Sequence, residues 1–239
     1  MTQKSTAPGS KARPGRDPGS GASSRPLNWP DDPETVTAAD IDFEALAHVL
    51  ANTCRRGGCC RQYHSVAAHA VIVSEEIETL DGLGDEDRRT LALHALLANA
   101  PSAWLRGRLP DSQRAAERTG KLATGIEVAV REAAGLDAIL DEDHGELLRF
   151  VTRMAAAAER RDLLDGNAAS GLAFPPLKRR IRSIPPDKAA EAWLARFRDL
   201  AGSDEERLRR GATSGLGAGT GEVETDSGSP EGASDAPRG

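Results

Sequence analysis

The chain has 239 residues, a formal net charge of -6, 3% aromatic residues and three cysteines. This length allows one ordinary domain or two small ones, and the negative charge disfavours nucleic-acid binding that depends on overall charge. We find no run of about 18 apolar residues, so we predict no membrane-spanning helix. The N-terminus lacks an apolar segment and the cysteine number is odd, so we expect a cytoplasmic protein.

Both ends of the chain have compositions that disfavour folding. Residues 1–28 are rich in Ser, Gly, Pro and Ala with an excess of basic residues, and residues 203–239 are rich in Gly, Ser, Thr and Glu. Neither has enough apolar side chains to offset the entropy of ordering, so we predict two disordered tails. The basic residues of the first tail are scattered, and no aromatic residues lie between them. This pattern is not a strong signal for nucleic-acid binding. One domain remains, residues 29–202.

Within this domain, apolar residues recur at helical period and β-branched residues are too few and scattered for strands. The fold class predicted from this pattern is all-α. The six predicted helices span residues 41–54, 65–80, 90–100, 112–135, 144–164 and 185–202.

Capping residues support these boundaries. Thr37 or Asp40 can begin the first helix, which Gly57 and Gly58 end, and Asp85 or Asp87 can cap the third. Gly135 can end the fourth helix, and Pro185 and Pro186 can start the sixth. Trp193 and Phe197 are four residues apart, so we expect them to form an apolar pair on the sixth helix.

The most informative stretch is LALHALLANAPSAWLRGRLP, residues 91–110. Leu93, Leu96, Leu97 and Ala100 lie on one face at helical spacing, so we expect most of this helix to be buried. Pro101 and a basic turn follow.

Five segments, in order, carry a resemblance to a known family: DIDFEALAHVLANTCRRGG, RQYHSVAAHAVIVS, the stretch above, ERRDLL and AEAWLARFRDL. The ordered set resembles the HD-domain metal-dependent phosphohydrolases, and more narrowly the bacterial branch with the nucleoside 5'-monophosphatases. The resemblance implies an HD-like bundle of about six helices. In that family a His, an adjacent His-Asp pair and a distant Asp bind one divalent metal. The ion lowers the pKa of a bound water and neutralises a phosphate oxygen.

When the family pattern is carried over residue by residue, this sequence has only one of the four expected metal ligands. His69 matches the first ligand, whereas Ala98 and Asn99 stand where the His-Asp pair is expected and Thr152 stands at the distant Asp. Alanine has no lone pair, and the Asn amide oxygen is neutral.

Two further positions of the family pattern have also changed. Ser102 replaces a catalytic Glu and Arg108 replaces an Asp in the following turn. Arg106 and Arg108 would bring positive charge toward a cation site, which opposes metal binding. We therefore interpret the site as degenerate and favour an inactive homologue that binds phosphate or a nucleotide, or that serves as an interaction module.

Three arginines precede His69 in the segment that contacts substrate in the family: Arg55, Arg56 and Arg61. An arginine binds phosphate in a bidentate manner without a metal, so these are candidate phosphate ligands. Solvated loop arginines are the other interpretation.

Alternatives stay open, including whether the chain is an enzyme. An active phosphohydrolase would hold Mn, Co, Fe, Ni or Zn at a shifted site recruiting His69, Asn99, His94 or Glu159. His94 lies one turn, or about 6 Å, before Ala98, so its use requires rearrangement. A decaying paralogue without activity is a third possibility, and the helices could pair into a homodimer.

The remaining candidate groups have plainer interpretations. Glu159 is expected to form an ion-pair cluster with Arg161 and Asp162, while His48 and His64 are expected to pack or to face solvent. A zinc site is disfavoured because the spacing C-x4-C-C lacks paired C-x2-C knuckles. The cysteines of this spacing are Cys54, Cys59 and Cys60.

Overall fold

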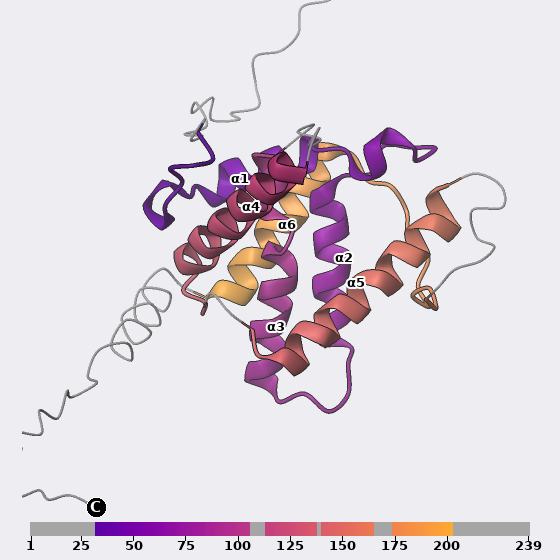
Figure 1. The fold of residues 1–239 in the computed structure, drawn as a ribbon. Coiled ribbons are helices and arrows are strands. Elements are labelled where there is room, and N and C mark those ends of the chain that lie inside the picture. The colour runs from indigo at the N-terminus through magenta and orange to yellow at the C-terminus, as the bar shows by residue number, and fades with distance from the viewer. Residues whose placement is uncertain (1–31, 106–112, 138–139, 165–173, 203–239) are drawn as a thin grey trace, which may run out of the picture.

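The computed structural model describes residues 32–105, 113–137, 140–164 and 174–202 (Figure 1). These residues form helices and no strand, which confirms the predicted all-α class. The two predicted disordered tails and Arg108 lie outside the described residues. The α-helices are α1 (Phe43–Asn52), α2 (Val66–Glu78), α3 (Asp85–Leu97), α4 (Gln113–Ala133), α5 (Glu142–Leu163) and α6 (Pro186–Ala201).

Helix α2 is at the centre of the packing. It lies beside α3 and also contacts α1, α5 and α6, while α6 packs in turn against α1 and α3 (Figure 1). Ala67, Ala68 and Ala70 are buried on α2, and such small side chains let neighbouring helices approach closely. Helix α5 extends across α2 and α3, so it is placed to contribute side chains to the same interior.

The core between α3 and α6 is built around Trp193. Its indole is fully buried, and Nε1 donates a hydrogen bond to the carbonyl oxygen of Leu96 at 3.3 Å. The Trp193 and Phe197 rings stack with centroids 5.7 Å apart, which confirms the predicted pair, and Phe197 also stacks on Phe43 at 4.0 Å. The aromatic stack therefore joins α6 to both α1 and α3.

The predicted third helix was displaced toward the C-terminus. Helix α3 begins at Asp85 and ends at Leu97, instead of spanning residues 90–100. The end follows from Pro101, which cannot donate to the Leu97 carbonyl and whose ring clashes with it. A separate 3-10 helix, η3 (Ala100–Ala103), continues the chain.

The start of α1 also differs from the prediction. Asp42 caps α1 by accepting bonds from the amides of Glu44 and Ala45, whereas Thr37 and Asp40 cap a preceding 3-10 helix, η1 (Ala38–Asp40). Helix α1 ends at Asn52, before the predicted glycines. The predicted end of α4 is confirmed, because Gly135 follows it with a φ of 70°.

We predict that Trp193→Ala will lower the free energy of unfolding by about 3–5 kcal/mol, because it leaves a cavity between three helices. Trp193→Phe keeps much of the ring volume and should cost less. Urea unfolding followed by circular dichroism measures both. Equal, small losses for the two variants would contradict this account of the core.

Candidate functional site

The segment between α1 and α2 turns sharply and carries all three predicted phosphate ligands. Arg56 and the two glycines after it have positive φ values of 54°, 60° and 85°. The amide of Arg55 donates to the His64 carbonyl at 2.8 Å, which closes the turn. Ser65 then begins α2 by accepting a bond from the amide of Ala68 at 3.1 Å. The turn thus fixes Arg55, Arg56 and His64 beside the start of α2.

These side chains converge on Glu159 of α5, whose carboxylate is fully buried. Its Oε1 lies 2.5 Å from His69 Nδ1, 3.2 Å from His64 Nε2 and 3.4 Å from Arg55 Nε. Its Oε2 lies 3.1 Å from Arg56 Nε. We refer to these five residues as the Glu159 cluster. Both oxygens of a buried acid are thereby compensated by neighbouring groups.

The charges of the cluster follow from its contacts. Burial by itself raises the pKa of Glu159, but hydrogen bonds from His64 and His69 and the charge of Arg55 bring that pKa well below its usual value. Burial lowers the pKa of His69. The arrangement is consistent with an anionic Glu159 between two guanidinium groups and a neutral His69.

Both ring nitrogens of His69 have protein partners. Nδ1 faces Glu159, and Nε2 lies 3.0 Å from Nη2 of Arg55. Since a guanidinium can only donate, Nε2 is the acceptor and Nδ1 carries the proton, an assignment made from the network. The lone pair that would bind a metal is therefore directed at a cation of the protein itself.

Two of the positions that the resemblance maps to metal ligands line one pocket. Ala98 and Thr152 both line a pocket of about 890 Å³ bordered by α3, α4 and α5. The Thr152 hydroxyl donates to the Leu148 carbonyl at 2.8 Å. His69 and Asn99 are not among the lining residues, so the predicted site residues are only partly brought together.

The pocket also contains charged side chains that the sequence did not single out. Arg149 and Arg153 line it from α5 and make no ion pair with other described residues, whereas Arg131 of α4 pairs with Glu127 at 3.5 Å. Asp141 and Glu142 lie at the start of α5 and also line it. The pocket therefore holds two guanidinium groups that make no ion pair with a described residue, together with two carboxylates.

Arg61 and Ser102 lie apart from both features. Nη2 of Arg61 donates to the Asp162 carbonyl at 2.8 Å, near the end of α5, and Ser102 is half-buried in η3. Of the three predicted phosphate ligands, only Arg55 and Arg56 share a site, and both contact Glu159.

The predicted cluster of Glu159 with Arg161 and Asp162 was wrong. Arg161 is rotated by about 200° from Glu159 around α5, so it faces away from the Glu159 cluster. It pairs with Asp162 at 2.6 Å, and Arg180 contacts the same carboxylate at 2.9 Å. The Arg161 contact and the Ile181 amide lower the pKa of Asp162 to about 2, although partial burial opposes this.

His64 is the functional-site residue whose importance sequence reasoning missed. It was expected to pack or face solvent, but it is fully buried against Glu159. No local pattern identified it, because its partner lies 95 residues away. The described residues contain no group of three or more His, Cys, Asp or Glu placed to hold a metal ion. The three cysteine thiols are free.

The site thus belongs to an all-α domain in which α5 contributes both to a buried carboxylate cluster and to a separate arginine-lined pocket. No family model matches this chain. The chain is similar to the uncharacterized protein YfdR of Escherichia coli (strain K12), with 27% identity over 179 residues. That match covers 70% of this chain and 89% of the relative. No described helix is long and apolar enough to cross a membrane.

We predict that Glu159→Gln will lower the free energy of unfolding by about 3–5 kcal/mol, because it leaves buried cationic groups without their counter-charge. Glu146→Gln, at an exposed position of the same helix, is the matched control and should have little effect. Chemical denaturation at neutral pH measures both. Similar stabilities for the two variants would show that the Glu159 cluster does not hold the fold together.

His94 generates a second prediction. It is buried on α3 and Nδ1 has no hydrogen-bond partner. Burial, followed by the charge of Arg131, lowers its pKa from 6.5 to about 4. The unfolded chain therefore binds more protons between these values, so stability should fall as the pH drops from about 6.5 to 4, by about 3 kcal/mol from this group.

His94→Leu should remove this part of the pH dependence, whereas His48→Gln, at an exposed site on α1, should not. Urea unfolding at several pH values gives the comparison. His69 and Glu159 contribute acid sensitivity of the same sign in every variant. Parallel stability curves for wild type and His94→Leu would refute the proposed titration of His94.

Proposed function

We propose that this chain is a non-catalytic homologue of the HD-domain phosphohydrolases that binds a phosphate or nucleotide ligand. The observation that carries the proposal is the 3.0 Å contact between Arg55 Nη2 and His69 Nε2. His69 matches the only family ligand that the sequence keeps. Its metal-binding lone pair accepts a hydrogen bond from a cation, and that cation would also repel a divalent ion at short range.

The pocket agrees with the residue mapping only in part, because Ala98 and Thr152 line it but His69 and Asn99 do not. Ala98 directly follows α3 and Thr152 lies on α5, 54 positions away, and both line the pocket, as the mapping expects of these two positions. Neither supplies a charged donor there. The Thr152 hydroxyl proton is used by the Leu148 carbonyl, and Ala98 has no donor atom.

Ligand binding is better assigned to the pocket than to the predicted loop arginines. Arg55 and Arg56 are held by buried Glu159, so their charges are partly neutralised and their geometry is fixed. Arg149 and Arg153 have no such partner and line a space within the usual size range of ligand sites. Their guanidinium groups can bind phosphate in a bidentate manner.

We test this with metal analysis of the purified protein and a phosphate-release assay on nucleoside monophosphates with added Mn, Co, Ni or Zn. We expect far less than one bound metal per chain and no hydrolysis above the blank. The same nucleotides, titrated calorimetrically, should bind wild type and lose affinity at least tenfold in Arg149→Ala/Arg153→Ala. Lys188→Ala/Arg198→Ala on α6 is the control with equal loss of charge.

The other outcomes separate the competing hypotheses. Metal-dependent hydrolysis that His69→Ala abolishes would identify an active phosphohydrolase with a shifted site. Metal-independent hydrolysis that is insensitive to His69→Ala would contradict both forms of the family hypothesis. Absence of both hydrolysis and nucleotide binding would favour an interaction module or a decaying paralogue.

A further inference from the structure

The exposed charge of α5 from residue 148 onward and of the segment before α6 is mostly positive, whereas the first turns of α5 carry exposed Glu142, Asp143 and Glu146. Among the described residues of 148–164 and 174–183, the acids are Glu159 and Asp162, whose side chains are 0% and 3% exposed. Five cations in these ranges make no ion pair with another described residue: Arg149, Arg153, Arg160, Lys178 and Arg182. A positive face of this kind lies on a chain whose formal net charge is -6.

Aromatic side chains are placed among these cations. Phe150 is 45% exposed on α5, and its ring meets Phe174 edge to face with centroids 6.2 Å apart. The Arg153 guanidinium lies 4.9 Å from the Phe174 ring centroid, which holds the second ring in place. An exposed, rigidly supported aromatic ring between free guanidinium groups is typical of a surface on which a base stacks.

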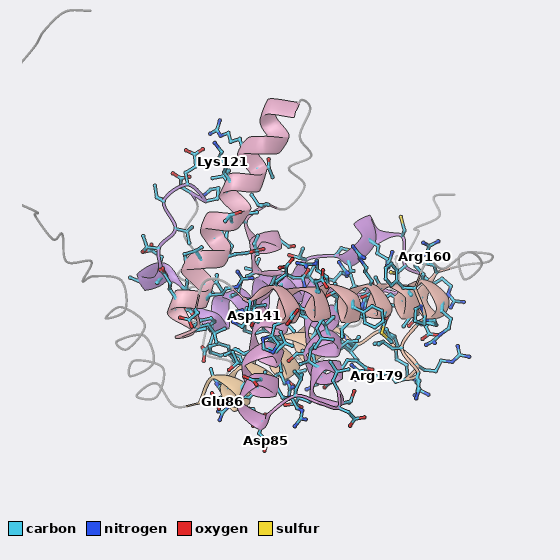
Figure 2. The ribbon with its side chains drawn as sticks, turned by 60° about the horizontal axis from the view of Figure 1, so that its bottom comes forward. Asp85, Glu86, Lys121, Asp141, Arg160 and Arg179 are labelled. Atoms are coloured by element: carbon cyan, nitrogen blue, oxygen red, sulfur yellow. The ribbon has the colours of Figure 1, made fainter. Side chains whose placement is uncertain are left out.

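The cations are spread along α5 instead of being gathered at one point. Figure 2 shows α5 from Asp141 at one end to Arg160 at the other, with Arg179 toward the Arg160 end. Arg149 and Arg160 are 11 residues apart, which corresponds to about 16 Å along the helix axis. This length exceeds what one mononucleotide needs and suits a short run of a phosphodiester backbone.

We propose that this face, defined by Arg149, Phe150, Arg153, Arg160 and the segment 174–182, binds single-stranded nucleic acid. The cations contact the backbone phosphates and Phe150 stacks on a base. The exposed aromatic ring favours a single strand over a duplex, whose bases are already stacked, and over an acidic peptide, which offers no flat partner. Arg149 and Arg153 also line the pocket, whereas Phe150, Arg160, Lys178 and Arg182 do not, so variants at these last positions test the face separately from the pocket.

The test is fluorescence anisotropy of a labelled 12-residue oligothymidine with the full chain. Phe150→Ala should weaken binding about tenfold through the lost stack. Lys178→Ala/Arg182→Ala should weaken it and reduce the slope of log affinity against log salt by about 1.4, from about 0.7 per phosphate contact. Lys188→Ala/Arg198→Ala on α6 removes the same charge elsewhere and should leave both unchanged, with circular dichroism confirming the fold of each variant.

Competition identifies the partner. Unlabelled single strand should displace the probe, whereas duplex of equal length, polyglutamate and nucleoside monophosphate should be much weaker competitors. Equal displacement by polyglutamate or duplex would overturn the assignment in favour of a general polyanion surface. Absence of binding at low salt, or equal effects of the α6 control, would overturn it entirely, whatever the result of the mononucleotide titration.

Discussion

A buried carboxylate sets the strongest constraint on this fold. Removing Glu159 from water costs several kcal/mol unless its oxygens find charged or hydrogen-bonding partners. Arg55, Arg56, His64 and His69 supply them, and three of these come from the turn between α1 and α2 or from its end. The carboxylate therefore holds an irregular segment, which has no apolar core of its own, against α5. Without that contact, the positive-φ turn at Arg56 would have little to stabilise it.

The same constraint decides what the arginines can do. In the proposed relationship to the phosphohydrolases, a divalent cation would stand near His69, and here a guanidinium contacts Nε2 instead. One positive group takes the electrostatic place of another, so the neutral imidazole remains satisfied without a metal. Neither Ala98 nor Thr152 places an unpaired charge in the interior. Under the proposed relationship, the helical core needs no metal for its stability.

Local patterns predicted most of the helices but little of the site. Helical periodicity, Gly135 and the Trp193–Phe197 spacing act over a few residues, so they were readable from the sequence. The partners of Glu159 lie 90 to 104 residues away, and nothing within one turn of α5 distinguishes Glu159 from an acid that pairs with Arg161. The predicted helix boundaries were wrong where two capping residues compete, as at Thr37 and Asp42, because only tertiary packing selects between them.

Net charge was a poor guide to the surface for a related physical reason. It sums acids and bases wherever they lie, but a neighbouring molecule experiences only charges that are exposed and not compensated. On α5, Glu159 forms ion pairs with the turn between α1 and α2, and Asp162 pairs with Arg161. Both carboxylates are buried in these contacts. Because those acids face inward, the later turns of α5 expose more cations than anions, although Glu142, Asp143 and Glu146 are exposed on its first turns. Burial of acids for stability thus leaves an excess of exposed cations on the later turns of α5, although the chain as a whole is acidic.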